Sequence, residues 1–476
     1  MTEHLNQACE KKLATSGSTF CSFPEQVPRV NESKKALVKE CTALLAEAEK
    51  TALTIADYSE LSMEETRSAD LLKHILQSHG FEITREFPLV PNAFVASFGQ
   101  GQPIVGLLAE YDALPDCGPD GQSPGHGCGH NLLGSASTFA AIALARVMAA
   151  RNLPGTVRLF GCPAEETLVG KVYMARDGAF DGLDACLAWH PSTYTHVNKG
   201  SGTAMDSVTY EFFGKTAHAA GDPHLGRSAL DAVEIMNVAV NYLREHVPPE
   251  VRMHYAIMDG GKAPNVVPPY ARSWYFVRGK NREQVAEVAR RVDDCARAGA
   301  LATGTEMKRT FLTAAYDRLA NDAIIRAMDS NLRLVGGPLF TEEDQQFIEQ
   351  LGIDGKLSGA ISPISTANSS GSSDEANVSW IAPLGRISVA CWASGTPGHH
   401  TLVHQQSVSP AAMKGLAVAI KTLALTGFDL LNDADLLAQA RKEFRERTQE
   451  KPYDPLIPPG QPAPVHDRIP DRPLTI

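Results

Sequence analysis

Four short islands of the sequence carry side chains that bind metal ions. A thiol, several imidazoles and several carboxylates together form the ligand set that zinc and neighbouring divalent metals take in proteins. Two glutamates are adjacent in one island, and a carboxylate beside a metal ligand can act as the base that activates water. The islands span residues 127–131, 162–166, 188–191 and 395–400. This combination predicts a metal-dependent hydrolase.

Each island by itself also fits a structural role. Cys128 and His130 are separated by one glycine, which puts both side chains on one side of an extended turn, yet a buried thiol with a structural histidine has the same pattern. Glu165 and Glu166 also fit a solvated acidic pair, and His190 fits a histidine of the core. The functional interpretation therefore depends on the islands occurring together.

The two adjacent glutamates suit different tasks in such a site. They follow an apolar stretch and a proline, so they are expected in a turn where neighbouring carboxylates point in different directions. One of them can bind metal. The other, whose pKa is raised by its like-charged neighbour and by burial, can accept a proton from water.

Length, charge and cysteine usage limit the class of protein. A chain of 476 residues predicts at least two domains, because a domain typically has about 150 residues. The net charge of -11 argues against nonspecific binding to nucleic acid or to anionic membranes. The nine cysteines lack the spacing of a disulfide framework. The chain has no basic start followed by an apolar stretch and no run of about 18 apolar residues, so we expect a cytoplasmic protein.

Helices and strands are expected to alternate, which predicts an α/β fold. Two of the islands fall just past the carboxyl ends of expected strands, where open α/β sheets place their ligands. A loop rich in serine and glycine is expected near the site at residues 356–371. The expected helices span residues 31–54, 64–79, 132–151, 321–335 and 410–425, and the expected strands span residues 105–110, 155–161, 185–189 and 387–391.

Residues 207–316 follow a different order, βαββαβ, which is the order of a split ferredoxin-like unit. We interpret this unit as an inserted domain, because the last island lies beyond it and completes the ligand set of the islands before it. Its expected strands are 207–213, 252–258, 270–278 and 306–313, and its expected helices are 228–247 and 282–302. The predicted domain limits are 1–205 and 317–450 for the two parts of a catalytic domain, 206–316 for the insertion, and 451–476 for a proline-rich tail.

Beyond these patterns, the sequence resembles a known family. Residues 109–115 read Ala-Glu-Tyr-Asp-Ala-Leu-Pro, and residues 125–134 read Gly-His-Gly-Cys-Gly-His-Asn-Leu-Leu-Gly. Together with the Glu-Glu, Trp-His-Pro and Gly-Thr-Pro-Gly-His islands, they resemble the M-twenty metallopeptidase family over residues 31–453. The resemblance is nearest to the aminobenzoyl-glutamate hydrolase B subunits of its amidohydrolase branch, and the indole-acetyl-amino-acid hydrolases and aminoacylases are also similar.

This resemblance implies a zinc-peptidase-like mixed sheet flanked by helices, with the ferredoxin-like insertion as a lid and dimerisation domain. It also implies two divalent metal ions per subunit, zinc or manganese, with Glu165 as the general base. His399 is preferred over its neighbour His400 because the family has one histidine at that position. The sequence does not show which ligand bridges the metals. The implied ligands are Cys128, His130, Glu166, His190 and His399.

The family pattern assigns further residues around this set. His218 is expected to stabilise the oxyanion in the active site of a partner subunit, which implies a homodimer. Asn265 and Arg278 are expected to hold a substrate carboxylate, although Arg278 also fits an exposed arginine at a strand end. Asp112 and Asp374 are expected behind the ligands. Many family members have a histidine two residues before the position of Asp112, where this chain has a glutamate.

The sequence therefore predicts a dinuclear metal-dependent amidohydrolase that cleaves the amide bond of N-acyl or N-aroyl amino acids such as aminobenzoyl-glutamate. Two alternatives remain open at this stage. One is a dipeptidase or aminopeptidase that acts on unblocked peptides. The other is a subunit of a heteromeric amidohydrolase, which would need a companion chain. We expect no nucleic acid or membrane partner.

Overall fold

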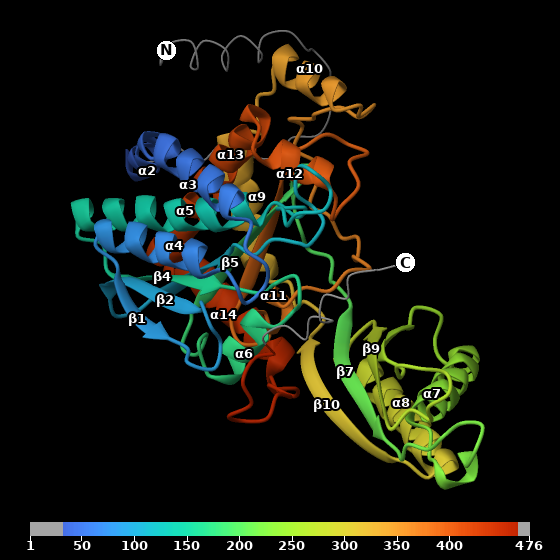
Figure 1. The fold of residues 1–476 in the computed structure, drawn as a ribbon. Coiled ribbons are helices and arrows are strands. Elements are labelled where there is room, and N and C mark those ends of the chain that lie inside the picture. The colour runs from blue at the N-terminus through green and yellow to red at the C-terminus, as the bar shows by residue number, and fades with distance from the viewer. Residues whose placement is uncertain (1–31, 465–476) are drawn as a thin grey trace, which may run out of the picture.

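The computed structural model describes residues 32–464, and two β-sheets organise them (Figure 1). The strands of the larger sheet are β1 (Glu82–Glu86), β2 (Phe94–Gln100), β3 (Ile104–Glu110), β4 (Gly155–Cys162), β5 (Ala185–Ser192), β6 (His196–Val197) and β11 (Leu384–Ala390). They lie in the order β1-β2-β4-β3-β5-β11-β6. Strands β4, β3, β5 and β11 run parallel, and the pairs at both edges are antiparallel. This mixed sheet confirms the predicted fold class.

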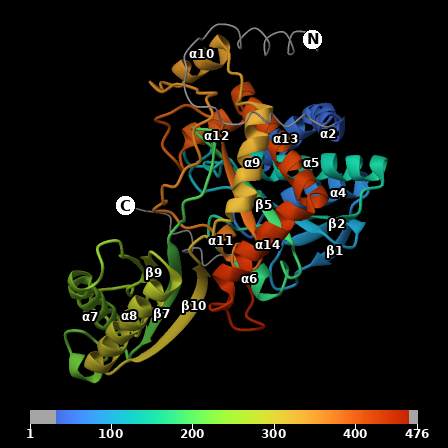
Figure 2. The same ribbon diagram turned by 180° about the vertical axis from the view of Figure 1, so that it is seen from behind.

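Alternating side chains of the central strands bury both faces of the larger sheet. In β3, Leu107 packs into the main core and Leu108 into a second core on the other face. The main core is formed with α2 (Glu32–Ala43), α3 (Leu45–Tyr58), α4 (Thr66–Ser78), α5 (His130–Arg151), α9 (Asp322–Val335), α13 (Pro410–Asn432) and α14 (Ala434–Thr448). The second is formed with α6 (Gly170–Arg176) and α11 (Glu375–Val378). Helices α10 (Glu342–Gln350) and α12 (Thr401–Ser407) lie near one end, as Figure 2 shows from behind.

Helices α5 and α13 are long and apolar enough to span a membrane by length and composition. Within residues 32–464 they are the two helices that pass this test, and their most apolar windows are 89% and 83% buried in the protein. Because they pack against the sheet and against each other, their apolar character is that of core helices.

One expected helix, residues 31–54, was wrong as a single element. The structure divides the region into α2 and α3 at Leu44, and Asn31 lies outside the described residues. The Leu44 amide donates to the carbonyls of both Glu40 and Cys41, at 3.2 Å each, which tightens the turn. The apolar pattern of both helices is continuous, so it could not show this break.

The smaller sheet comprises β7 (Ala204–Phe213), β8 (Arg252–Asp259), β9 (Tyr270–Gly279) and β10 (Glu306–Ala315), with α7 (Ala229–Leu243) and α8 (Arg282–Thr303). Its order β10-β7-β9-β8, all antiparallel, is that of a split ferredoxin-like unit. Its own apolar core lies between this sheet and the two helices. Ser228 begins α7 by accepting a hydrogen bond from the Asp231 amide. In Figure 1, β7 and β10 run from this unit toward the larger sheet.

The described part of the proline-rich segment, residues 451–464, has no helix or strand. It nevertheless packs onto the larger body, because Ile457 and Ala463 are buried in its second core and the Ala463 amide donates to Leu89 at 2.8 Å. Residues 465–476 lie outside the described residues.

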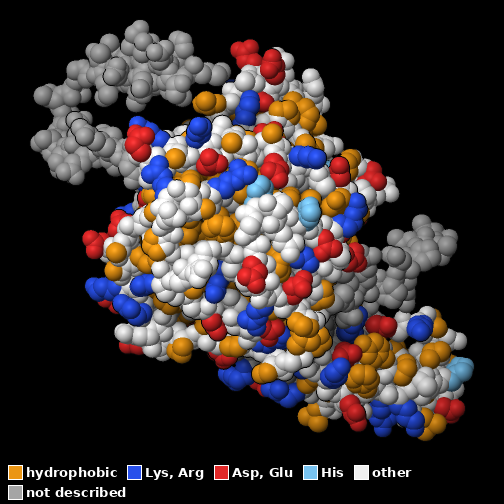
Figure 3. All heavy atoms as spheres, turned by 90° about the vertical axis from the view of Figure 1, so that its left-hand side faces the viewer, with side chains coloured by type: hydrophobic (Ala, Val, Ile, Leu, Met, Phe, Trp, Pro, Cys, Tyr) orange, Lys and Arg blue, Asp and Glu red, His pale blue; other side chains and the backbone are white. Residues whose placement is uncertain are grey.

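On the face seen in Figure 3, Lys and Arg side chains are interspersed with Asp and Glu. No continuous basic surface is visible there, in keeping with the acidic composition of the chain.

Candidate metal centre

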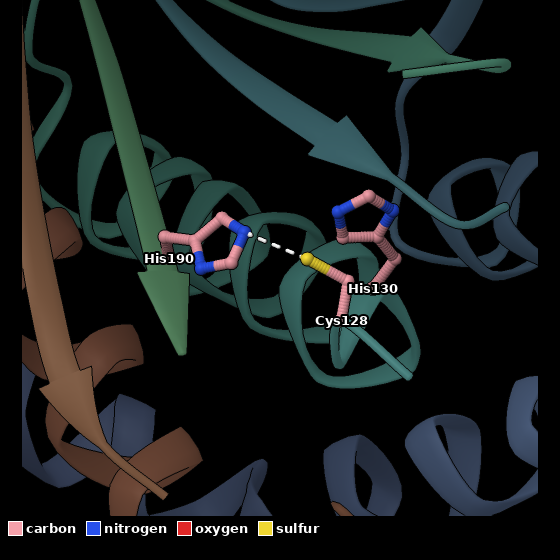
Figure 4. A group of neighbouring side chains, drawn as sticks. All are labelled: Cys128, His130 and His190. Atoms are coloured by element: carbon pink, nitrogen blue, oxygen red, sulfur yellow. Dashed lines mark hydrogen bonds between the residues drawn. The ribbon is translucent and has the colours of Figure 1, made fainter. Parts of the chain in front are cut away.

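The parallel strands of the larger sheet bring the sequence islands to one edge. Glu110 ends β3, the Glu165 and Glu166 turn follows β4, and His190 lies near the end of β5. Because parallel strands end on the same side, three segments that are far apart in sequence meet there. Figure 4 shows His190 projecting from its strand toward Cys128 and His130 at the start of α5.

The glycine between Cys128 and His130 is required by both conformation and space. Gly129 has φ 75°, in the left-handed region. A Cβ atom at this position would lie 2.9 Å from both Pro191 Cγ and Trp392 Cζ3. This close turn allows Cys128, just before α5, and His130, its first residue, to point into the same site.

Two groups of ligand atoms share one thiol. In the first group, Cys128, His130 and His190 have ligand atoms within 4.8 Å of one another, and Cys128 Sγ lies 3.4 Å from His190 Nε2 (Figure 4). In the second group, Cys128 meets Glu166 and His399 under the same limit. The Cys128 thiol therefore belongs to both candidate ligand groups.

His399, and not His400, reaches this cluster. His399 Nε2 lies 3.6 Å from Glu166 Oε2. The His400 ring instead begins α12, where its Nδ1 accepts a hydrogen bond from the Leu402 amide at 3.1 Å. His399 has φ 52°, a strained value for a residue with a side chain, which is common at functional sites.

Asp112 orients His130 and leaves its other nitrogen free. Asp112 Oδ1 lies 2.8 Å from His130 Nδ1, and Asp112 Oδ2 accepts hydrogen bonds from Ser62 Oγ and the Glu166 amide, at 2.9 Å each. Both side chains are fully buried. His130 Nε2 is buried without a hydrogen-bond partner among the described residues, as a nitrogen reserved for a metal would be.

Glu165 lies beside the ligands in a position suited to proton transfer. Its Oε2 is 3.8 Å from His130 Nε2. Glu165, Glu110 and His130 form a third candidate ligand group, whose ligand atoms lie within 4.8 Å of one another. Burial, followed by the negative charge of Glu110, raises the pKa of Glu165 to about 7. A carboxyl group with such a pKa can both take and return a proton at neutral pH.

A buried lysine that the sequence analysis missed stands behind this carboxylate. Lys171 Nζ lies 2.8 Å from Glu110 Oε1 and 2.5 Å from Asp374 Oδ1, and all three side chains are buried. The Lys171 amide also donates to Asp374 at 2.8 Å. Asp374 therefore contacts Lys171, which in turn fixes Glu110 beside His130 and Glu165. The run Gly-Lys-Val-Tyr-Met-Ala around Lys171 contains no signal for a buried charge.

The donor set fits divalent cations. Burial, followed by the negative charge of Glu166, raises the pKa of the Cys128 thiol to about 12, and burial raises the pKa of Glu166 to about 8. Both groups therefore keep their protons at neutral pH until a cation displaces them. Sulfur, nitrogen and oxygen donors gathered in a largely buried cluster are a combination that divalent metal ions take in proteins.

A cavity of about 400 Å³ opens beside the cluster and is lined by Cys128, Glu165 and His190 among others. Arg278 lines it from the smaller sheet and donates to Ser372 Oγ at 2.8 Å. The expected loop contributes residues 369 and 371. Three further charged residues of the wall, Arg318, Glu375 and Arg386, were missed by the sequence analysis. Arg386 is the one charged residue of β11, a signal that could have identified it.

The structure does not bring His218 and Asn265 to this cavity. Both are exposed on loops of the smaller unit, where His218 Nδ1 accepts from the amides of Ala220 and Gly221. His218 and Val266 form an isolated bridge, so the two predicted segments do lie side by side. Neither predicted residue lines the cavity that contains Cys128.

Comparison with known proteins identifies the family. Residues 202–303 match the family model described as the peptidase dimerisation domain. The chain is 37% identical to the p-aminobenzoyl-glutamate hydrolase B subunit of Escherichia coli, over 85% of this chain and 93% of that protein. This chain belongs to the M-twenty peptidase family.

Two further similarities extend the comparison. The chain is 30% identical to the Xaa-Arg dipeptidase of Mus musculus, over 82% of this chain and 87% of that protein. Among solved structures, the aminobenzoyl-glutamate utilization protein from Klebsiella pneumoniae has a TM-score of 0.60 at 19% identity, covering 83% of this chain and 99% of that chain. At that identity the second similarity shows a shared fold.

Proposed function

We propose that this member of the hydrolase family is a dinuclear metal-dependent amidohydrolase that cleaves N-acyl or N-aroyl amino acids. The observation that carries the proposal is the placement of Cys128 in two ligand groups, with the carboxylate of Glu165 beside them. The similarity to the p-aminobenzoyl-glutamate hydrolase of Escherichia coli supports this substrate class. In this chain, the proposed ligands of the two metal ions are Cys128, His130, Glu166, His190 and His399.

The bound cations would supply Lewis acidity that polarises the scissile carbonyl and activates water. The residues of this chain do the rest. Glu165 accepts a proton from the attacking water and returns it to the leaving amine. Asp112 holds His130 in orientation, and Arg278 holds the substrate carboxylate. Asn265, which lies beside His218 outside the cavity of its own chain, would join Arg278 from a second copy of the chain.

We further propose that the protein works as a homodimer in which His218 hydrogen-bonds the developing oxyanion in the partner's site. Two features of the smaller unit support this. β8 is an edge strand within the described residues, and α7 and β8 expose large apolar side chains. These are Val238, at 53% exposure, Tyr242, at 72%, and Ile257, at 46%. We therefore assign residues 206–316 to a dimerisation and lid domain and residues 1–205 and 317–450 to the catalytic domain.

The first test is Glu165→Gln, assayed with p-aminobenzoyl-glutamate. Removing the base should lower kcat by about 100-fold or more while both metals are retained, because Glu165 is not in either ligand group that contains Cys128. Glu349→Gln, on the exposed face of α10, is the matched control and should keep full activity. Undiminished turnover in the Glu165 variant would refute its assignment as the base.

The second candidate function is a dipeptidase acting on unblocked peptides, which the similarity to the Xaa-Arg dipeptidase favours. Parallel assays of p-aminobenzoyl-glutamate and Ala-Arg with the purified chain separate the two. The mass and turnover of the chain alone also show whether it needs a companion chain. Elemental analysis of protein purified without added metal distinguishes zinc from manganese.

We also propose a cytoplasmic location. All seven described cysteines are free thiols, which accords with this proposal.

A further inference from the structure

Two arginines and one glutamate of the cavity wall form a cluster with a net positive charge. Arg318 Nη1 lies 3.1 Å and Arg386 Nη1 lies 3.4 Å from the same oxygen, Glu375 Oε1. One carboxylate therefore faces two guanidinium groups. Arg278 lines the same cavity without an acidic partner among the described residues, which adds a further positive charge.

The two arginines of this cluster differ in their exposure and in how many of their hydrogen-bond donors already have acceptors. Arg318 has a side chain only 7% exposed, and it donates to the Gly200 carbonyl as well as to Glu375. The Arg386 side chain is 22% exposed, and within residues 32–464 its guanidinium has the Glu375 ion pair and no hydrogen bond. Arg318 thus holds Glu375 in place, and Arg386 keeps donors available for a bound anion.

The sheet register places Arg386 close to the metal ligands. Ser388 pairs with His190, and Arg386 pairs with Ala188, two residues earlier on the same two strands. Since alternate residues of a strand share a face, Arg386 and His190 project from the same face, about 7 Å apart along the strand direction. A short substrate side chain can span such a separation.

Arg386 is the one charged residue in strand β11. β11 is otherwise formed by Leu, Gly, Ile, Ser, Val and Ala, and all of these residues are buried, whereas Arg386 is partly buried. Placing a guanidinium there costs desolvation energy, which the negative charges of Glu375, Glu110 and Glu165 offset, so the side chain stays charged beside the cavity. A planar guanidinium can bind a carboxylate with two parallel hydrogen bonds.

We propose that Arg386, held by Glu375 and Arg318, binds a second carboxylate of the substrate and makes the enzyme select N-acyl derivatives of acidic amino acids. This inference rests on the proposed amidohydrolase function and identifies a residue that determines its specificity. Arg278 takes the α-carboxylate of the amino acid, and Arg386 takes the carboxylate of its side chain. A leaving amino acid with a basic side chain is repelled by the same cluster.

The test compares p-aminobenzoyl-glutamate with p-aminobenzoyl-glutamine, which has nearly the same shape and lacks the second charge. The wild-type kcat/KM should favour glutamate by about 30-fold or more, the effect of losing one desolvated charge pair. Arg386→Gln should bring this ratio close to one by slowing the glutamate substrate, with the glutamine substrate nearly unchanged. Arg333→Gln, which removes a surface ion pair with Asp329 on α9, is the matched control and should keep the wild-type ratio.

Several results would overturn the inference. A wild-type ratio near one does so without any variant, even if Arg386→Gln fails to fold. Equal losses on both substrates in a folded Arg386→Gln protein assign the arginine a purely structural role. Arg386→Lys, which keeps the charge and loses the planar fork, should give an intermediate ratio, and a ratio of one there also contradicts the inference. A wild-type protein inactive on every N-acyl amino acid refutes the proposed function itself, a distinguishable outcome.

Discussion

At the carboxyl ends of β3 and β5, the larger sheet buries His130 and fixes it with Asp112, whereas the smaller sheet carries His218 on an exposed loop. The first histidine has its partners within the chain. Within residues 32–464, the hydrogen-bond partners of the second histidine ring are two backbone amides, and this ring lies outside the cavity. The comparison indicates that a parallel sheet edge can gather candidate metal ligands within one chain, whereas the role that we propose for the histidine of the insertion depends on the proposed homodimer.

The larger sheet should lose its function entirely when the shared thiol is removed. Cys128→Ala takes a ligand from both groups, so both metals should be lost and turnover should fall by more than the roughly 100-fold typical of losing an outer partner. Metal content by elemental analysis and kcat by assay check this. Cys41→Ala, a buried thiol of α2, should keep both metals. Two metals retained without Cys128 would contradict the shared-ligand geometry.

The smaller sheet should show its dependence on a partner by complementation. His218→Ala alone should lower kcat by about 100-fold, as the loss of one oxyanion donor does. Mixing it with Glu165→Gln should restore activity, because one site of each mixed dimer then has both groups; random exchange predicts about a quarter of wild-type activity. The assay follows activity after subunit exchange. A mixture as inactive as its two components would place His218 in the site of its own subunit.

The metal centre should also respond to pH in a way that the insertion does not. The raised pKa values of Glu166, about 8, and of Cys128, about 12, mean that both are protonated near neutral pH before metal binds. Binding must release these protons, so the apparent metal affinity should rise with pH, by about tenfold per unit for each proton released. Competition with a chelator at pH 6, 7 and 8 measures this. An affinity that stays constant over this range contradicts the protonated state.

The smallest expected effect concerns the stability of the insertion. Ser228→Ala removes the acceptor of the hydrogen bond that the Asp231 amide donates at the start of α7, and it should lower the free energy of unfolding of this unit by about 1 kcal/mol. Urea denaturation followed by circular dichroism measures it. Ser330→Ala, inside α9 and exposed, should be neutral or slightly stabilising because alanine favours helix interiors. Metal content should remain the same in both variants. Loss of metal in the Ser228 variant would contradict the expectation that the metal centre of the larger sheet does not depend on the stability of the insertion.

Residue patterns predicted the framework and could not predict its charged interior. The βαββαβ order and the strands before the glutamate pair and His190 were readable because apolar runs and turn residues are local signals. The role of Lys171 depends on Glu110 and Asp374, which are distant in sequence, and the pairing of Arg318 and Arg386 with Glu375 depends on sheet order. The preference for His399 over His400 came from family resemblance and stays a prediction; in the structure His399 Nε2 lies 3.6 Å from Glu166 Oε2.

Anomalous X-ray diffraction from crystals of the metal-loaded protein tests the central claim most directly. The account predicts two metal peaks about 4 Å apart, on either side of the Cys128 sulfur, with His130 and His190 at one and Glu166 and His399 at the other. A single peak, or two peaks of which neither contacts Cys128, would contradict it.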